Sequence, residues 1–515
     1  MTLEIGVRTT DFEFELPGRG GSAREFTISP SEAPTRSNEH LNQTETERVL
    51  TTQQKIAILL MVMGIAAAAF IAPLTTALVI NGFIVLFFGA ANLFKLVLVR
   101  RALDNSAALK ISPAQLEALE DRELPVYTIL VPLYHEAQMV PQLIQGISQL
   151  NYPLDKLDVK VLLEEDDDET RDALDRYNVP DSFEVLTIPD IGPKGKPRAC
   201  NAGLSRARGQ YLVIYDAEDR PEPDQLRKVV IAFRDGPPEQ ICIQAKLNYF
   251  NRRYNLLTRW FTAEYSVWFD QLLPGLQSMD VAIPLGGTSN HFVTARLREL
   301  GGWNAFNVTE DADLGMRVFV RGWKTAVIDS TTYEEANSRV GNWIRQRSRW
   351  VKGYMQTYLY QMRHPYRLYR QMGFKAFFAF HLFFGAGTFC LLINPLYLAL
   401  TVVWFGFHPH VIQLLFPGGL LYVCTASFFL GNAAFTIATV SGCYARRHYD
   451  DVKWALLAPV YWMLMSIGAW KGVLQLIYKP YYWEKTKHGF CVLPDDESQP
   501  VTLPHLVEEP LALPA

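Results

Sequence analysis

The sequence predicts a soluble α/β domain inserted between two sets of membrane-spanning α-helices. Apolar residues make up 49% of the 515 residues, and they concentrate near residues 56–99 and 376–478, while charged residues fill the middle. Short apolar runs in that middle alternate with helical stretches, which is the pattern of a mostly parallel sheet. Basic and acidic residues nearly balance, 49 against 53. This balance argues against nucleic-acid binding, which normally requires a basic surplus.

The N-terminal apolar region predicts a transmembrane hairpin over residues 53–101. One apolar run ends at Ala72 and a second continues to Val99, and each is long enough to cross a hydrocarbon core of ~30 Å. The turn between the runs carries no charge, whereas basic residues flank both outer ends. The positive-inside rule therefore places both flanks in the cytosol. Residues 1–52 are polar and are expected to form a disordered cytosolic tail.

Four short apolar runs predict the strands of the soluble domain, which is expected to span residues 124–340. The runs are Tyr127–Pro132, Val159–Leu163, Phe183–Ile188 and Tyr211–Tyr215. Helical stretches separate them, so the strands are expected to pair mostly in parallel. Residues 102–123 are expected to form a linker helix.

Residues 341–385 predict interfacial helices, because they mix aromatic and basic side chains. The C-terminal membrane region is expected to span residues 386–478, with crossing segments near 386–407 and 417–441. Its last apolar stretch, Trp454–Tyr478, raises a conflict. Counting it as a span puts the C-terminus outside, yet the basic segment that follows favours the cytosol.

Prolines, glycines and a lysine interrupt this last stretch: Pro459, Gly468, Lys471 and Gly472. We therefore expect an interfacial or re-entrant helix there. Residues 479–515 would then form a cytosolic tail.

Two segments of the soluble domain carry charge where a parallel sheet binds ligands. The strand ending at Leu163 runs into five acids, residues 164–168, whose carboxylates could accept hydrogen bonds from a nucleoside. A solvated acidic loop is the alternative. Glycines and the cations Lys194, Lys196 and Arg198 follow, and these could meet phosphate charge.

Three further motifs suggest chemistry. Asp216 and Glu218 have the spacing that holds a hard divalent cation through oxygen ligands, although a polar turn would explain the prolines that follow. Asp311 lies at the predicted start of a helix, where a cap is the simpler reading. Residues 346–350 lie on the basic helix, where snorkelling side chains are the alternative.

Taken in order, these motifs resemble those of processive family 2 glycosyltransferases, the cellulose-synthase-like group of bacterial polysaccharide and β-glucan synthases. The matching elements, over residues 55–490, are the acids at 164–168, Lys196-Pro-Arg-Ala-Cys-Asn201, Asp216-Ala-Glu218, Pro284-Leu-Gly-Gly-Thr-Ser-Asn290, Thr309-Glu-Asp311 and Gln346-Arg-Ser-Arg-Trp350. The resemblance implies an α/β GT-A glycosyltransferase domain between transmembrane segments. It also implies an inverting hexosyltransferase that builds a β-linked polysaccharide.

The resemblance assigns roles to individual residues. It implies catalytic roles for Asp311 as general base and for Glu310, Arg349 and Trp350. It implies substrate contacts by Glu165, Asp167, Lys196, Asp216, Gly287, Thr288, Gln346, Arg349 and Trp350. Asp216 and Glu218 are expected to bind Mg²⁺ or Mn²⁺, with Asp219 as a rival to Glu218. Trp483 and Thr486 resemble the gating loop of cellulose synthases, which closes over the donor.

These roles imply a multi-pass protein of the inner (plasma) membrane with a cytosolic catalytic domain. The expected partners are a nucleotide sugar, for which UDP-glucose is the leading candidate, a growing glycan chain, the lipid bilayer, and periplasmic or outer-membrane export proteins. A glucan is the expected product. Two alternatives stay open: a non-processive transferase to a lipid acceptor, and a non-catalytic membrane scaffold or transporter.

Overall fold

The computed structural model describes residues 24–27, 48–105, 107–177, 180, 182–190 and 194–485. Most of the predicted tails 1–52 and 479–515 therefore lies outside the described residues, and so does Thr486.

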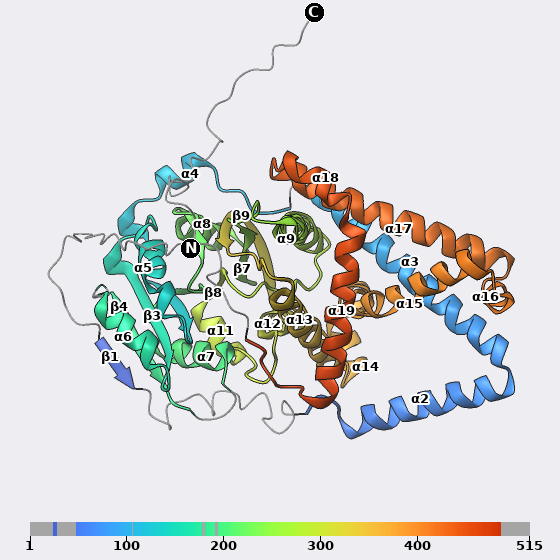
Figure 1. The fold of residues 1–515 in the computed structure, drawn as a ribbon. Coiled ribbons are helices and arrows are strands. Elements are labelled where there is room, and N and C mark those ends of the chain that lie inside the picture. The colour runs from blue at the N-terminus through green and yellow to red at the C-terminus, as the bar shows by residue number, and fades with distance from the viewer. Residues whose placement is uncertain are drawn as a thin grey trace, which may run out of the picture.

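A nine-stranded mixed sheet forms the centre of the soluble domain (Figure 1). Its strands are β1 (Arg24–Thr27), β2 (Tyr127–Leu133), β3 (Leu157–Glu164), β4 (Phe183–Ile188), β5 (Tyr211–Ile214), β6 (Arg220–Pro221), β7 (Gln240–Tyr249), β8 (Asn290–Val293) and β9 (Lys324–Glu334). They are ordered β1-β4-β3-β2-β5-β8-β7-β9-β6. The four predicted strands are β2 to β5, and they pair in parallel as expected. β8 runs antiparallel to both of its neighbours, β5 and β7.

Helices cover both faces of this sheet, and this explains why its central strands are buried on both sides. All eight residues of β3 are buried. On one face lie α5 (Val140–Ser148), α6 (Asp168–Arg176) and α8 (Gln225–Asp235); on the other lie α7 (Lys196–Arg206), α11 (Thr294–Leu300) and α12 (Glu310–Val320). The predicted α/β GT-A fold is thus confirmed.

The predicted linker helix over residues 102–123 is wrong. Within the described part of that segment, helix α3 (Pro73–Asn105) continues into it and α4 (Pro113–Ala118) forms a short helix. Between them the chain is extended, because Leu109 joins the sheet beside Ile328. The Leu109 N–H donates to the Val327 carbonyl at 2.7 Å, and the Leu109 carbonyl accepts from Asp329 N at 2.8 Å. A sheet pairing supplied by a distant strand outweighs the local helical preference here.

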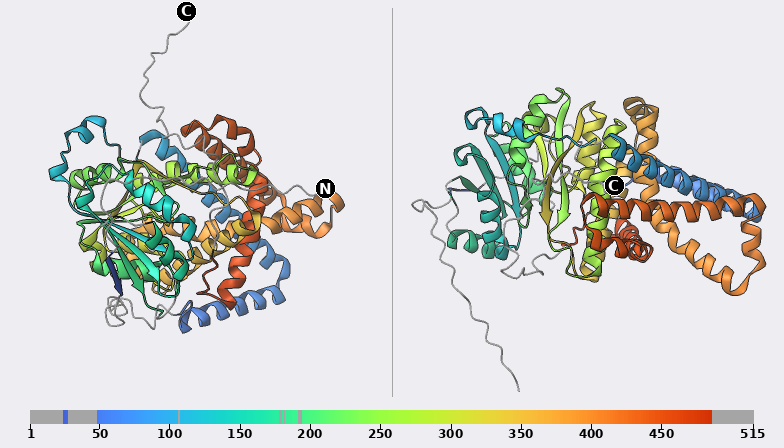
Figure 2. Two further views of the ribbon diagram at one scale, coloured as in Figure 1. Left: turned by 60° about the vertical axis from the view of Figure 1, so that its left-hand side comes forward. Right: turned by 90° about the horizontal axis from the view of Figure 1, so that it is seen from above.

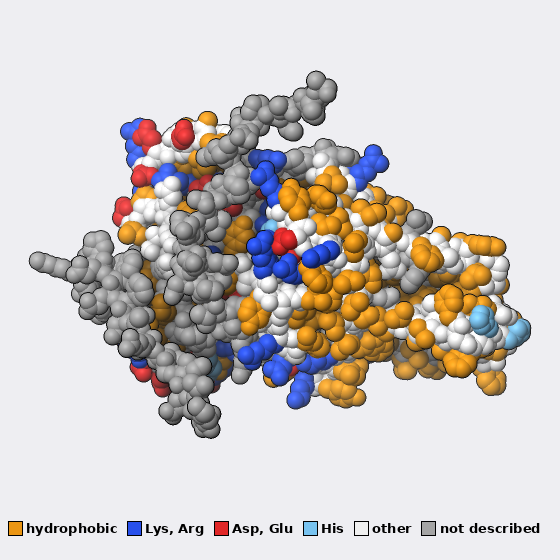
Figure 3. Space-filling model, turned by 45° about the horizontal axis from the view of Figure 1, so that its top comes forward, with side chains coloured by type: hydrophobic (Ala, Val, Ile, Leu, Met, Phe, Trp, Pro, Cys, Tyr) orange, Lys and Arg blue, Asp and Glu red, His pale blue; other side chains and the backbone are white. Residues whose placement is uncertain are grey.

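Together with α3, eight further helices of differing length form the apolar half of the molecule. They are α2 (Thr52–Ile71), α13 (Val340–Gln361), α14 (Pro365–Phe380), α15 (Ala386–Phe407), α16 (His410–Leu415), α17 (Gly418–Ala445), α18 (Val452–Ala455) and α19 (Ala458–Tyr478). Among the described residues, five helices are long and apolar enough to cross a membrane: α2, α3, the continuous α14–α15 segment, α17 and α19. Figure 3 shows apolar side chains over this half, with lysines and arginines gathered at its border with the soluble domain.

The apolar stretch Trp454–Tyr478 is interrupted near Pro459, where α18 ends and α19 begins, but the predicted interruptions at Gly468, Lys471 and Gly472 are wrong, because α19 is one continuous helix over residues 458–478. Its glycines serve packing. A Cβ on Gly472 would lie 2.8 Å from the Ser348 carbonyl oxygen, and one on Gly468 would lie 3.0 Å from Arg347 Cβ, so both glycines allow α19 to lie close against α13. In Figures 1 and 2, α19 runs across α3 and α17 instead of alongside them. An interfacial position for α19 stays a prediction, and this orientation favours it.

Ion pairs join the membrane helices to the soluble domain. At the end of α17, Arg446 Nε lies 2.5 Å from the carboxylate of Asp270, which also pairs with Lys246 of β7 at 3.0 Å. Asp451, in the turn before α18, is buried and pairs with Arg252 at 2.7 Å and also with Arg259. These contacts fix the α17–α18 turn to the face of the sheet domain.

Candidate active site

A cavity of about 460 Å³ lies between the sheet domain and the membrane helices. Its soluble half is built at the carboxyl ends of the parallel strands, where ligands bind in open α/β sheets. Most of the residues proposed from the sequence line it: Lys196, Asp216, Glu218, Gly287, Thr288, Glu310, Asp311, Gln346, Arg349, Trp350 and Trp483.

The acidic run after β3 presents a different residue to the cavity than the sequence analysis selected. Glu165 is exposed, and its carboxylate accepts from Asp190 N at 3.2 Å. Asp167 is fully buried and caps α6 by accepting from Thr170 N at 3.1 Å. Neither belongs to the cavity wall, whereas Glu164 does, where it pairs with Arg198. The roles of Glu165 and Asp167 stay predictions.

Lys196 and Asp216 meet at the floor of the cavity. The Lys196 ammonium pairs with the Asp216 carboxylate and donates to the Gly287 carbonyl at 2.8 Å. Burial opposes its charge, yet the carboxylate of Asp216 holds the pKa of Lys196 above its usual value. The sequence placed these three residues in separate motifs, and the fold brings them together.

The acids after β5 divide into two roles. Asp216 and Glu218 both line the cavity. Asp219 is buried behind them, where its carboxylate accepts hydrogen bonds from Asp216 N at 2.8 Å and from the hydroxyl of Thr288. Burial and the charges of Asp216 and Glu218 raise the pKa of Asp219 well above its usual value. Of the two rivals, Glu218 is therefore the one that faces the cavity.

Oxygen ligands of this kind suit Mg²⁺ or Mn²⁺. Within the part of the chain that the structure describes, no group of three or more Asp, Glu, His or Cys side chains is arranged to hold a metal by itself. Magnesium commonly binds through one or two carboxylates and completes its shell with substrate phosphates. Asp216 and Glu218 fit that mode.

Asp311 lies in the first turn of α12, beside Glu310. Its carboxylate accepts from Ala312 N at 2.7 Å and lies over Gly287, where a Cβ would be 3.6 Å away. Burial raises the pKa of the Asp311 carboxyl to about 7, and the charge of Glu310 acts in the same direction. A carboxylate with a pKa near neutrality is suited to taking a proton.

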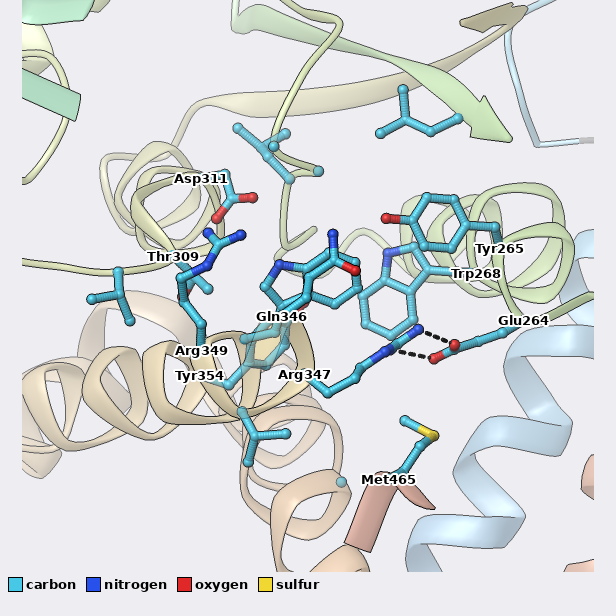
Figure 4. A pocket seen from close by; sticks show the side chains of 18 of the residues that line it. Glu264, Tyr265, Trp268, Thr309, Asp311, Gln346, Arg347, Arg349, Tyr354 and Met465 are labelled. Carbon is cyan, nitrogen blue, oxygen red and sulfur yellow. Dashed lines mark hydrogen bonds and ion pairs between the residues drawn. The ribbon is translucent and has the colours of Figure 1, made fainter. Parts of the chain in front are cut away.

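Helix α13 supplies the opposite wall. Figure 4 shows the Arg349 guanidinium facing the Asp311 carboxylate. The Gln346 side chain lines the cavity and accepts from Asn337 at 3.0 Å. The Trp350 ring lies near Tyr265, with ring centroids 6.2 Å apart. Together these residues give the cavity a cation and an aromatic wall opposite its acids.

A buried ion pair lines the cavity beside the aromatic wall. Arg347 makes two bonds to the Glu264 carboxylate, one of them at 2.8 Å (Figure 4), and its guanidinium lies 4.6 Å from the Trp350 ring centroid. The hydroxyl of Tyr461 on α19 also bonds Glu264, at 2.5 Å. No sequence signal pointed to this arrangement, because Glu264 and Tyr461 lie far from Arg347 in the chain.

The segment after α19 returns to the cavity. Lys352 on α13 donates to the Tyr482 carbonyl at 2.6 Å, and Lys485 donates to the carbonyl of Tyr134, beside the acidic run. Trp483 lines the cavity, with the Arg349 guanidinium 5.6 Å from its ring centroid. Trp483 is thus brought to the site, and Thr486 falls outside the described residues.

The cavity continues between the membrane helices, which the sequence analysis did not foresee in residue detail. Its walls there come from α3, α15, α17 and α19. They carry amides, a lysine and aromatic rings: Phe88, Asn92, Lys95, Thr388, Asn394, Asn432, Phe435 and Trp462. A hydropathy pattern cannot distinguish cavity-facing from lipid-facing positions, which explains why these residues gave no signal.

Two described protein families match parts of this chain. Residues 128–283 match the family described as Glycosyl transferase family 2, and residues 211–440 match Glycosyl transferase family group 2. Residues 128–440 are therefore similar to family 2 glycosyltransferase domains.

Named relatives share this domain. A protein of Bacillus subtilis (strain 168) named "Probable glycosyltransferase YdaM" is 27% identical over 51% of this chain and 64% of its own length. "Probable glucomannan 4-beta-mannosyltransferase 7" of Oryza sativa subsp. japonica is 26% identical over 45% of this chain and 41% of its own. "Beta-monoglucosyldiacylglycerol synthase" of Synechocystis sp. is 27% identical over 46% and 49%. The chain thus spans about half the length of these relatives.

Among solved structures, a mannosyltransferase of Pyrobaculum calidifontis in complex with GDP-Man and Mn²⁺ is similar at a TM-score of 0.45. The two chains are 19% identical, and the match covers 77% of this chain and 99% of the mannosyltransferase.

Proposed function

We propose that this chain is a membrane-bound, inverting glycosyltransferase that polymerises a β-linked polysaccharide from a nucleotide sugar and passes the product between its own helices. One observation carries the proposal. A single cavity reaches from Asp216 and Asp311 to Asn394 and Asn432 between the membrane helices. Amides and aromatic rings in that inner part suit the hydroxyls and apolar faces of sugars.

The residues of the site suit an inverting displacement. Asp311 takes the proton of an acceptor hydroxyl, and the hydroxyl oxygen then attacks the anomeric carbon from the face opposite the leaving diphosphate. Arg349 and Lys196 place positive charge beside that diphosphate, and Trp350 stacks against the acceptor sugar. Asp216 and Glu218 would hold Mg²⁺ or Mn²⁺, which, when bound, offsets the charge of the leaving group.

The nucleotide sugar binds at the end of the cavity that lies in the soluble domain. Glu164 is the acid of the 164–168 run that lines the wall, and we assign it the nucleoside contact in place of Glu165 and Asp167. Gly287 and Thr288 shape the floor beside Lys196. Trp483 closes over the donor from the other side.

The proposed setting is the inner membrane, with the soluble domain in the cytosol. Both ends of the α2–α3 hairpin carry basic residues, as the positive-inside rule requires for that side. If α19 lies in the interface, its following segment, which contacts the active-site cavity, stays on the same side. Export proteins beyond the membrane would receive the product.

A second candidate is transfer of one sugar to a lipid, because relatives named beta-monoglucosyldiacylglycerol synthase share the domain. Product size decides between the two. Purified protein in lipid nanodiscs is incubated with Mg²⁺ and labelled UDP-glucose, UDP-galactose, UDP-N-acetylglucosamine, GDP-mannose or UDP-glucuronate. The product is then separated by solvent extraction and gel filtration and digested with linkage-specific hydrolases. A long, water-soluble or insoluble glycan supports the proposal, whereas label confined to a solvent-extractable monoglycosyl lipid refutes it.

A further inference from the structure

One charged side chain lies inside the membrane part of the cavity. Lys95 is on α3, ten residues before the end of that helix, and it lines the cavity together with Phe435 of α17 and Cys390 of α15. Its ammonium lies 5.2 Å from the centroid of the Phe435 ring. Arg100 and Arg101, further along α3, are exposed. Lys95 is therefore distinct from the basic residues that mark the end of the hairpin.

Within the described residues, Lys95 has no carboxylate partner at ion-pair distance. The acid that lines this side of the cavity, Glu264, is already paired with Arg347. An ionisable residue inside a membrane region is costly and normally faces a partner or a functional pathway. The cation–π contact with the Phe435 ring offsets only part of the cost of burying the Lys95 ammonium.

An amide group whose N–H donors are not used by any described residue lies one helical turn from Lys95. Asn92 lines the same cavity, and its Nδ2 is buried without a hydrogen-bond partner. Gly431 of α17 lies opposite, where a Cβ would be 2.5 Å from that nitrogen. The glycine thus lets α17 approach the amide closely. Buried donors are normally satisfied, so the Asn92 amide beside the Lys95 ammonium points to a ligand.

We propose that Lys95, Asn92 and Phe435 form a binding site for an acidic sugar unit of the passing glycan. This inference rests on the proposed function and narrows its substrate class to polymers that carry carboxylates, as hexuronic acids do. Lys95 pairs with the carboxylate, Asn92 donates to a ring oxygen or hydroxyl, and Phe435 packs against the sugar face. A neutral glucan would leave the lysine charge without a counter-ion at this point of the path.

Binding of defined oligosaccharides tests this site without knowledge of the donor. Purified full-length protein in nanodiscs is titrated with a β-1,4-linked hexauronate and with the neutral hexasaccharide of the same linkage. We expect the hexauronate to bind about tenfold more tightly than the neutral hexasaccharide, because one hydrogen bond to a charged group changes Kd by about that factor. In Lys95→Gln this preference should disappear, and in Lys95→Arg it should return.

Arg101→Gln is the matched control, because it removes one cation from the exposed end of the same helix. It should keep the full preference for the hexauronate. Thermal unfolding and yield of each variant in nanodiscs show whether it folds. If Lys95→Gln does not fold, Lys95→Met with the same titration replaces it.

Equal binding of the two hexasaccharides by the natural protein, or an unchanged preference in Lys95→Gln, would overturn the inference. Displacement of the hexauronate by a short-chain prenyl phosphate would assign the site to a lipid phosphate and overturn it as well. The proposed function fails separately, if none of the neutral or acidic nucleotide sugars yields a polymer. A polymer built from neutral donors alone, with no acidic preference at Lys95, would leave the proposed function intact and refute only this inference.

Discussion

Replacing Gly353 by alanine should separate the two walls of the active site. Gly353 lies in the middle of α13, against Thr309, which precedes α12. A Cβ on Gly353 would lie 2.5 Å from Thr309 Cγ2 and 2.7 Å from Thr309 Cβ. Carbon atoms in contact lie about 3.5–4.0 Å apart. The helices must therefore move apart by about 1 Å, since rotation of the short threonine side chain cannot remove its own Cβ.

That movement acts on the reacting groups. Asp311 lies two residues after Thr309, and Arg349 lies one turn before Gly353, so the facing pair in Figure 4 would separate. A misplacement of about 1 Å can reduce turnover by roughly 10²-fold. Overpacking costs about 1–3 kcal/mol, and the helix gains back roughly 0.5–1 kcal/mol when alanine replaces glycine. The free energy of unfolding should thus fall by at most about 2.5 kcal/mol.

The assay is nucleotide release by purified protein at saturating donor, together with thermal unfolding in nanodiscs. Gly341→Ala is the matched control, because a Cβ on Gly341 of the same helix meets nothing within 4 Å. Adding Thr309→Ala to Gly353→Ala removes the clash with Cγ2 and should restore part of the turnover. Wild-type turnover in Gly353→Ala would refute the argument, and so would an equal loss in Gly341→Ala.

Four further outcomes follow from the site. Asp311→Asn should lower polymer synthesis by about 10²–10⁴-fold with donor affinity unchanged in calorimetry; more than a few per cent residual activity would contradict its role as base. Because the pKa of Asp311 is about 7, its basic form should rise from about one tenth at pH 6 to about nine tenths at pH 8, and the initial rate should rise in proportion; a flat profile would argue against it. Excess EDTA should abolish turnover and added Mg²⁺ or Mn²⁺ should restore it, whereas full turnover in EDTA would remove the metal from the scheme. Trp483→Ala should sharply lower turnover at normal protein abundance, and Tyr478→Ala, which changes an exposed aromatic on α19, should not.

The sequence predicted those parts of the fold that local pattern controls. β2 to β5 and the break between α2 and α3 lie where the apolar runs placed them. The strands β7, β8 and β9 were not predicted, because their pairing joins segments that lie far apart in the chain. The same reason explains the error at Leu109, because this residue pairs with the distant strand β9 and does not form the helix that its local sequence favours.

At the site, the sequence predicted which residues take part more reliably than it predicted where their side chains point. Motif order identified Asp216, Glu218 and Asp311, which share one cavity. Between Glu164 and Glu165 no pattern could choose, since successive residues at a strand end point to opposite sides. The glycines of α19 looked like interruptions because their use depends on α13, which packs against them.

The ion pairs at the α17–α18 turn constrain how a product could advance. Asp270 holds cations from both the sheet and α17, and Asp451 is buried against Arg252 and Arg259. Removing one member of such a buried pair typically costs about 3–5 kcal/mol, so thermal motion rarely opens it. At this turn the sheet domain and α17 therefore resist the rocking motion by which the two halves of a transporter move. Under the proposed function, each added sugar is then moved by parts that these ion pairs leave unrestrained, and the sheet domain and α17 keep their positions while the polymer advances.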